Sequence, residues 1–417
     1  MPVSSTTTLS GLAKELYPLS EIKDMEQRVT AYKMEVDEAE GLEFSAASGG
    51  TFKFPVKASG PHGQKMMNEQ EALPTARTSN VVQGTAAVKE YAGVLQFTKR
   101  ELELAKGDAK SFANAKTFEM EGLIEQAHKY FNRQMVAGTG VGTMTLVQGT
   151  QTAQTQIEVD DASPFMIGQV LDIWNSAGTA KQASSIVVTD IDLLSSPNSI
   201  TVDTTTTCDD NGIITLAGLR DNMATDGKEM FGLSMATDDG TDAATFQGIT
   251  RTGAGEVPNY RGIEFSVGGP ISVEAINRLC TRSLRMAGTD FVKSNDCYFL
   301  FSPEQWRSYA SLAVPQVRFQ PTDSADFNKP YTQYECMGKR VVIDTDLERT
   351  RVYLIKKSAA KLAVAAPLDW EEDLGGTSLK WLSGYAQGIM LLYALMQHFF
   401  PAPRDMAALV GLTSVDI

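Results

Sequence analysis

The longest regular pattern of apolar residues in the chain predicts a helix of about eight turns over Asp108–Val136. Its apolar residues recur at spacings of three or four and form one stripe: Phe112, Ala115, Met120, Leu123, Ile124, Ala127, Tyr130, Phe131 and Met135. Such a helix is roughly 43 Å long, well above the ~11–12 residues of an ordinary globular helix. Gly138, Gly140 and Gly142 follow it, and we interpret them as a cap and turn. A phosphate-binding loop would instead place its glycines between a strand and the next helix.

An extended pattern precedes this helix. Thr51–Lys57 alternates apolar and polar residues, as a two-faced strand does. A tip over Ser59–Thr78 leads to a return strand over Asn80–Phe97. The resulting long hairpin has too few large apolar residues to bury both faces within itself. Pro55 and nearby lysines protect its edge from wrong pairing, so we expect the hairpin to pack on another subunit.

The pattern of apolar and polar residues changes twice in the rest of the chain. Before the hairpin, Leu12–Ala39 has the apolar spacing of an amphipathic helix. After the long helix, short strands separated by turn residues predict a small β-barrel or sandwich inserted as a unit: Gln156–Val159, Gln169–Trp174, Ser185–Ile191, Ser199–Asp203 and Gly212–Leu216. Beyond it, predicted helices and strands mix. The helices are Ser272–Ala287 and Pro303–Leu312. The strands are Asp296–Ser302, Arg340–Ile343, Val352–Ile355, Lys361–Val364, Leu379–Leu382 and Gly388–Met396. Because they lack a βαβα rhythm, the predicted fold class is α+β.

Charge is distributed unevenly. The net charge is −14, and Met144–Thr250 alone has 15 acidic against 3 basic residues, a balance of −12. An acidic segment on a nearly neutral body argues against sequence-specific DNA binding. A solvated, solubilising face and a cation-binding face both fit the acidic segment, and the first is favoured.

The sequence predicts neither disulfides nor a membrane partner. Its four cysteines are far apart and match no metal-binding spacing, as expected of reduced, buried thiols in a cytosolic product. Met1–Ser10 lacks the apolar core that a signal peptide has. The strongest apolar run, Ile389–Leu395, is too short for a membrane span and predicts a buried strand.

Motifs of catalysis are absent from the sequence. There are three histidines, distant from one another, and no nucleophile elbow, zinc-protease motif or P-loop. Carboxylates cluster in two places, at Asp238, Asp239 and Asp242 and at Glu371 and Glu372, which leaves a metal-dependent hydrolase as a rival interpretation. Turn chemistry explains both clusters more simply. We therefore expect no catalytic residue, no cofactor and no metal site.

In order, these segments resemble the major capsid protein of tailed bacteriophages (Caudoviricetes), with the Hong Kong 97-type fold. The resemblance rests on the arm, the hairpin and the long helix, followed by Met230–Ala236, Thr245–Arg251 and Pro258–Gly262. These three segments read MFGLSMA, TFQGITR and PNYRG, similar to a Gly-Leu, aromatic-x-Gly-Ile-x-Arg and Pro-x-aromatic series before the axial domain of such capsids.

The resemblance implies a division of the chain. It comprises an N-terminal arm (1–40), an extended-loop hairpin (41–105), a spine helix and turn of the peripheral domain (106–143), an acidic β-rich insertion domain (144–245), a mainly axial domain (246–358) and peripheral-domain strands (359–417).

It also implies a function: a non-enzymatic subunit that self-assembles into the icosahedral head shell around packaged double-stranded DNA. The expected partners are hexamers and pentamers of itself, a portal, a possible decoration protein on the insertion domain, and DNA held nonspecifically. A forty-residue arm is too short for a fused scaffolding domain, so a separate scaffolding protein is expected. The location would be the virion, after assembly in the host bacterial cytoplasm.

Interlocking of arm and loop is expected to be non-covalent. No asparagine follows Asn328, so an isopeptide acceptor is missing from the C-terminal strands. A subunit ladder surviving boiling in detergent would contradict this. The candidates for inter-subunit contact are Phe52, Lys53, Phe54, Val56, Lys57 and Tyr91. The apolar ones fit equally well against the chain's own spine helix. A tail tube or sheath subunit is the other structural interpretation.

Overall fold

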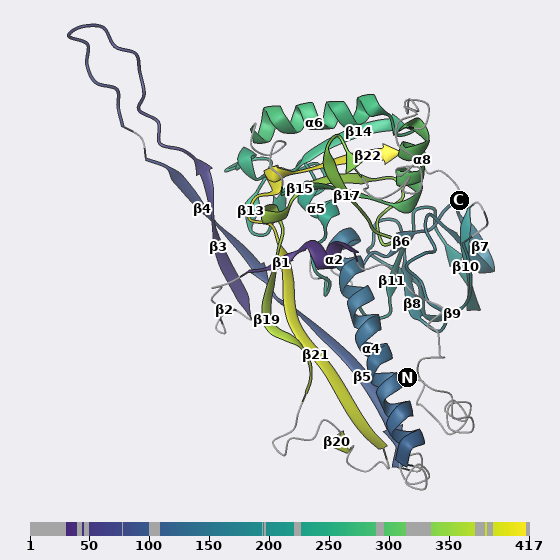
Figure 1. Ribbon diagram of the computed structural model, residues 1–417. Coiled ribbons are helices and arrows are strands. Elements are labelled where there is room, and N and C mark those ends of the chain that lie inside the picture. The colour runs from purple at the N-terminus through teal and green to yellow at the C-terminus, as the bar shows by residue number, and fades with distance from the viewer. Residues whose placement is uncertain are drawn as a thin grey trace, which may run out of the picture. The chain divides into compact units, whose positions relative to one another are not determined.

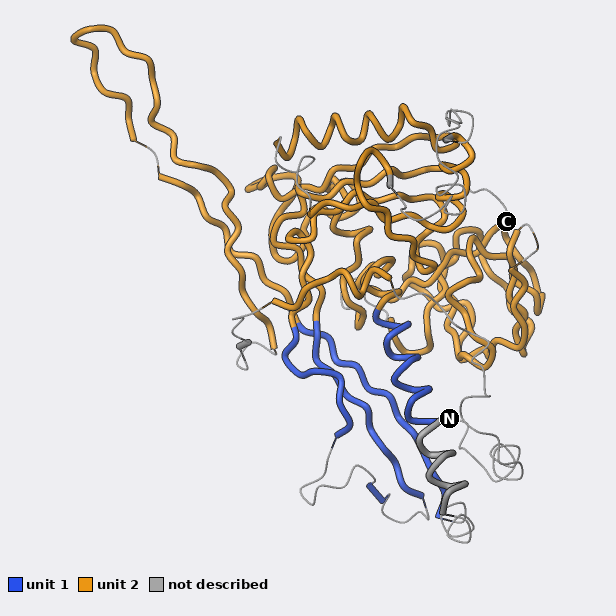
Figure 2. The backbone as a smooth tube through the Cα atoms, viewed as in Figure 1, with its two compact units in different colours: residues 1–29, 88–131, 364–396 blue, residues 30–87, 132–363, 397–417 orange. Residues whose placement is uncertain are grey.

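The computed structural model describes residues 31–39, 44–45, 50–76, 78–99, 109–193, 195, 197–220, 227–288, 296–313, 335–371, 380–381 and 387–413 (Figure 1). Most of the predicted helix Leu12–Ala39 lies outside them, and α2 occupies Ala31–Glu35. The chain forms two compact units (Figure 2). The first contains described residues of 88–131 and 364–396, and the second those of 30–87, 132–363 and 397–417.

The first unit combines the long helix with a sheet. Helix α4 (Ala109–Ala137) matches the predicted spine helix to within one residue at each end. Strand β21 (Gln387–Phe399) pairs antiparallel with β5 (Lys89–Thr98) and β20 (Lys380–Trp381). Strand β19 (Lys361–Trp370) belongs to the same sheet, and its first residues, which lie in the second unit, pair with β1 (Asp37–Glu38) of that unit. Alternate side chains of β21 are buried, as expected of a sheet covered on one face.

The predicted return strand is two strands. β3 (Thr51–Ser59) pairs antiparallel with β4 (Asn80–Ala87) and with β2 (Phe44–Ser45). After Val88 the chain continues as β5, which pairs with β21 instead of β3. The single hairpin strand predicted over Asn80–Phe97 is therefore wrong in extent. Strand-like composition continues through both segments, so it does not reveal where the backbone exchanges one hydrogen-bonding partner for another.

Residues 145–216 of the second unit, which we call the β-domain, form a six-stranded sheet. In spatial order its strands are β6 (Thr145–Leu146), β11 (Ile213–Leu216), β8 (Val170–Trp174), β9 (Lys181–Asp192), β10 (Asn198–Cys208) and β7 (Gln151–Val159). A bridge between Val147 and Val159 joins its two edges. Gln148 N donates to Glu158 O at 2.9 Å beside it. The sheet therefore closes on itself around a buried aliphatic core that includes Ile157, Ile173 and Ile200.

A second six-stranded sheet holds the other core. Its order is β14 (Ile263–Gly269), β22 (Met406–Leu412), β18 (Val352–Lys356), β15 (Cys297–Phe301), β17 (Lys339–Ile343) and β16 (Glu335–Cys336). Helix α6 (Val273–Ala287) begins at an N-cap, where Ser272 Oγ accepts from Ala275 N. Its buried face joins this core, as do aromatic residues of α8 (Pro303–Ala313). Short elements complete the unit: α5 (Leu233–Thr237), β12 (Thr245–Phe246), β13 (Ile249–Thr250), η3 (Pro258–Tyr260), η6 (Lys357–Ala359) and η7 (Pro403–Asp405).

The glycine turn after α4 is a cap and a close backbone contact. Gly138 N donates to Gln134 O at 2.9 Å, and Gly138 O accepts from Gly232 N at 2.7 Å. A Cβ atom at Gly138 would lie 2.2 Å from Gln134 O and 2.6 Å from Met230 O. Gly140, at φ +78°, turns the chain. The predicted cap and turn are confirmed.

Replacing Gly138 with alanine is expected to lower the free energy of unfolding by about 3 kcal/mol, because its Cβ would meet backbone on two sides. Gly122, inside α4, has open space around its Cβ position, so Gly122→Ala is the matched control. It should stabilise by about 1 kcal/mol through helix propensity. Denaturant unfolding of both variants tests the contrast, and equal effects would contradict it.

Candidate functional site

The loop between β3 and β4, residues 60–79, which we call the hairpin tip, exposes apolar side chains. Met66 is 97% and Leu73 84% exposed. With Gly63 and Pro74 they line an open hollow. A turn shapes the loop, since Glu71 N donates to Asn68 O at 3.2 Å. Exposed apolar side chains that gather in one place mark interaction sites, and these gather in one loop.

The base of the hairpin is fixed to its own unit. Phe52 packs edge-on against Phe399, with ring centroids 5.0 Å apart, and Phe54 lies 5.4 Å from the same ring. Thr85 N donates to Gln247 O at 2.9 Å. Two anchored strands therefore present a tip whose apolar residues remain exposed.

These contacts revise the expected roles of the hairpin residues. Phe52, Phe54 and Val56 are buried by their own chain, so their burial requires no neighbour. Phe52 and Phe54 pack on Phe399, a cover that neither expectation named. The reason is that β3 pairs with β4 beside the end of β21.

Of the remaining candidates, two lysines are exposed and one tyrosine packs on its own chain. Lys53 and Lys57 are exposed and stay predicted contact residues. Tyr91 lies on β5 and packs against Phe131 of α4, with centroids 4.8 Å apart, and beside Tyr130. Burial raises the pKa of Tyr91. Tyr91 therefore packs on the chain's own helix, and its contact with another subunit stays a prediction.

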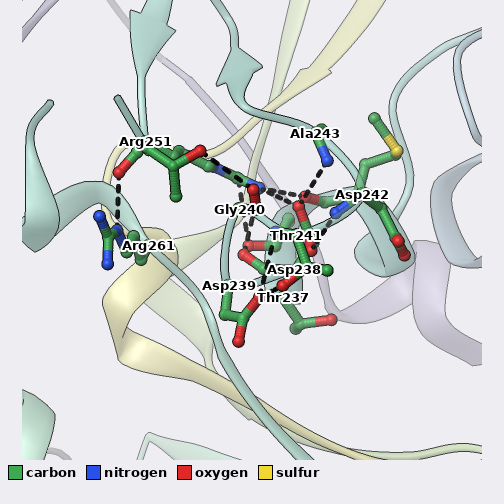
Figure 3. A network of polar contacts seen from close by, with 12 residues as sticks. Thr237, Asp238, Asp239, Gly240, Thr241, Asp242, Ala243, Arg251 and Arg261 are labelled. Atoms are coloured by element: carbon green, nitrogen blue, oxygen red, sulfur yellow. Dashed lines mark hydrogen bonds and ion pairs between the residues drawn. The ribbon is translucent and has the colours of Figure 1, made fainter. Parts of the chain in front are cut away.

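The Asp238 cluster builds a loop around a buried arginine (Figure 3). Asp238 accepts from Asp242 N at 3.2 Å and from Ala243 N at 3.0 Å. It also pairs with Arg251 Nη1 at 3.4 Å. Asp239 instead accepts from Thr241 N at 3.1 Å. The carboxylates of Asp238 and Asp239 are thus engaged in turn formation.

Arg251 is fully buried and completes this network. Its Nη1 donates to Met235 O at 2.8 Å and its Nη2 to Ala236 O at 3.3 Å, so it satisfies carbonyls of α5. The guanidinium lies 4.2 Å from the ring centroid of Phe246. Burial lowers the pKa of Arg251 to about 10. Arg251 holds three segments of the chain together, a role that its sequence motif did not reveal.

Of the second acidic cluster, the structure describes Glu371. Glu371 is exposed and pairs with Lys380 at 2.9 Å, and Glu372 lies outside the described residues. Within the described part of the chain, no group of histidine, cysteine and acidic side chains could hold a metal ion. No described helix has the length and apolarity of a membrane span.

A buried carboxylate fixes the start of α2. Asp344 accepts from Tyr32 N at 2.8 Å and from Asn132 Nδ2 at 3.0 Å. Asn132 Oδ1 in turn accepts from Lys33 N at 2.9 Å. Side chains of Asp344 and Asn132 thereby satisfy N–H groups at the N-terminus of α2. Burial and the neighbouring Asp346 raise the pKa of Asp344 to about 6.

This raised pKa predicts a pH dependence. The folded state binds the proton of Asp344 more tightly than the unfolded state, whose pKa is near 3.8. Stability from this group is therefore full below about pH 4 and is lost as the pH rises through about 6. Relative to Asp344→Asn, the wild-type free energy of unfolding should fall by about 3 kcal/mol across that window.

Urea unfolding of wild type and variant at several pH values measures this difference. Asp369→Asn, which removes an exposed carboxylate, is the control for the substitution of aspartate by asparagine. A wild type that gains stability relative to Asp344→Asn as the pH rises would contradict the account.

The first unit presents an apolar sheet face. Ile389, Leu391, Tyr393 and Leu395 alternate with the buried residues of β21 and are half-buried. Across the ladder, Val94 lies opposite Leu391 and is 40% exposed. An apolar strip of this kind is typical of an interface.

Solved capsid structures have a similar architecture. No family model and no curated protein matches the sequence. Among solved structures, the chain is similar to "Capsid of native GTA particle computed with C5 symmetry", with 11% identity, 99% of this chain and 100% of that chain covered, and a TM-score of 0.51. It is also similar to the capsid of cyanophage A-1(L), with 10% identity, coverage of 95% and 98%, and a TM-score of 0.57.

The chain has a capsid-protein fold. The matched span of the capsid fold takes in nearly the whole chain, and with it both units. A fold survives at 10–11% identity when the pattern and volume of buried residues are kept, because many combinations of apolar side chains fill the same core.

Proposed function

We propose that this chain is a major capsid protein that self-assembles into the icosahedral head shell of a tailed phage around double-stranded DNA. The capsid fold over nearly the full length is the observation that supports this most strongly. The finer assignment to the Hong Kong 97-type fold is supported by the hairpin, by helix α4 and by the order of the segments between them.

Assembly in this proposal is a non-covalent interlocking of copies. The hairpin tip offers Met66 and Leu73, and the β21 face offers Leu391 and its neighbours. Each contact is modest, but a shell repeats it in every hexamer and pentamer, so weak interfaces add up. Lys53 and Lys57 on the exposed face of β3 would contribute polar contacts at the rim.

The division of the chain keeps the boundaries expected from the sequence. Residues 1–40 serve as the arm, 41–105 as the extended loop, 106–143 and 359–417 as the peripheral domain, 246–358 as the axial domain and 144–245 as an inserted domain. Strand β22, within 359–417, pairs with β14 and β18 and so belongs to the sheet of the axial segment. Closure of the β-domain sheet upon itself supports treating it as a separate insertion.

The proposed partners follow from the same assignment. They are other copies of the chain, a separate scaffolding protein, the portal and a decoration protein on the acidic β-domain. Contact with packaged DNA would be nonspecific, as the nearly neutral remainder of the chain suggests. The protein would assemble in the host bacterial cytoplasm and end in the virion.

Negative-stain electron microscopy of the purified full-length chain, with and without its candidate scaffolding protein, tests the proposal. Closed shells are the expected product. Helical tubes would select a tail tube or sheath subunit, and single particles of monomer size at high concentration would overturn assembly altogether.

A further inference from the structure

Helix α6 presents a row of arginines to solvent. Its buried residues are Ala275, Ile276, Leu279 and Ser283. Arg278, Arg282 and Arg285 occupy the exposed face, one per turn. At 1.5 Å per residue they are spaced by about 6 and 4.5 Å along the axis, roughly 10.5 Å in all. We call these three residues the arginine row.

Most of the arginine row lacks a partner. Arg278 pairs with Glu274 of the same helix. Among the described residues, neither Arg282 nor Arg285 has an ion-pair partner. Their charge is therefore available to an acceptor outside the described chain.

The β-domain presents the complementary surface. Strands β7 and β9 flank β10, and Ser199 of β10 lies opposite both Glu158 and Asp192. Paired residues point to the same side, so Glu158 and Asp192 lie on the side of the sheet that faces away from the aliphatic core, two strand spacings or about 9.6 Å apart. Ser199 between them is 2% exposed, and Asp192 is half-buried with its Oδ1 accepting from Ser195 N at 3.1 Å, whereas Glu158 is exposed. Asp190 follows on the same side, about 6.7 Å along β9. We call Glu158, Asp190 and Asp192 the carboxylate face.

The two surfaces differ in the sign of their charge. The arginine row is cationic, and the β-domain has nine acidic residues against one basic residue, Lys181, so the two surfaces are complementary in charge. Within one chain they do not meet, because α6 packs on β14, β22 and η7. Figure 1 shows α6 apart from β7 and β10.

We propose that the arginine row of one copy docks on the carboxylate face of a second copy. The contact joins two different surfaces, so every copy donates one and accepts one, and such head-to-tail contacts generate rings when the rotation between copies closes. This inference rests on the proposed shell function and adds a specific ring contact to it. Duplex DNA is the weaker candidate occupant, since three arginines and one glutamate leave α6 a small net charge.

Charge reversal on each side tests the docking. The first variant is Arg282→Glu with Arg285→Glu, the second is Asp190→Lys with Asp192→Lys, and the third combines all four changes. Each of the first two should raise the protein concentration needed for assembly by about tenfold or more, because like charges then meet. The combined variant should return it to within about threefold of wild type. Sedimentation and electron microscopy measure assembly, and thermal unfolding checks that each variant folds.

Arg307→Glu, on the exposed face of α8, is the matched control and should assemble as wild type does. The inference is overturned if reversal of the arginine row leaves assembly unchanged, or if the combined variant fails to recover. Unchanged assembly with weakened, salt-sensitive retention of duplex DNA would assign the row to DNA instead. If the wild type forms no assembly, the proposed function fails and this inference fails with it.

Discussion

Replacing Arg251 with alanine is expected to lower the free energy of unfolding by about 3–5 kcal/mol, because the substitution leaves a buried carboxylate without its cation. Asp238 is 2% exposed and would keep only backbone donors. The carbonyls of Met235 and Ala236 would lose their donor at the same time. Chemical denaturation of the full-length chain measures the loss.

Two further variants make this prediction specific. Arg307→Ala removes an exposed arginine and should change stability by no more than about 0.5 kcal/mol. Arg251→Lys keeps the charge but loses the planar fork and the contact with Phe246, so it should be intermediate. An Arg251→Ala chain as stable as the Arg307→Ala control would refute the role assigned to this network.

Replacing both Met66 and Leu73 with serine is expected to abolish assembly while leaving the folded chain intact. Both side chains are almost fully exposed in the single copy, so their removal costs the fold nothing. If a neighbour buries them, each should lose about 1.5–3 kcal/mol of interface free energy, and a shell repeats that loss at every copy. Assembly yield, measured by sedimentation, should therefore fall, while the melting temperature of the chain should stay unchanged.

Ile167→Ser provides the matched control for this prediction. Ile167 is 64% exposed and lies in the β-domain, away from the hairpin. Its replacement should leave both assembly and melting temperature unchanged. Normal shells from the Met66 and Leu73 double variant would show that the hairpin tip is not an assembly contact.

Segments with a strong local period could be predicted from the sequence. The long helix was expected over Asp108–Val136 and is found over Ala109–Ala137, because nine apolar residues repeat at helical spacing. The five strands expected after it are all present in the β-domain, where turn residues separate them. Local pattern was sufficient in both cases because neither depends on which distant segment pairs with it.

Two kinds of feature could not be predicted. Strand β22 was missed because Met406–Val410 are all buried, which removes the alternation that identifies a strand. The division of the return strand between β4 and β5 depends on the distant partner β21, and nothing within Asn80–Phe97 specifies that partner.

The candidate site shows the same contrast. Sequence alternation correctly put Phe52 and Phe54 on one face of a strand, but their cover, Phe399, is more than three hundred residues away. Met66 and Leu73 were overlooked although apolar residues in a polar loop are a readable signal. The sequence around Asp344 did not indicate its role, because its partners Tyr32 and Asn132 come from the arm and the long helix.

The most direct test of the account is a cryo-electron microscopy reconstruction of the particles formed by the full-length chain. We expect a closed shell in which the hairpin tip of each copy lies on another copy and buries Met66 and Leu73 there. A reconstruction in which those two side chains still face solvent, or contact only their own chain, would contradict it.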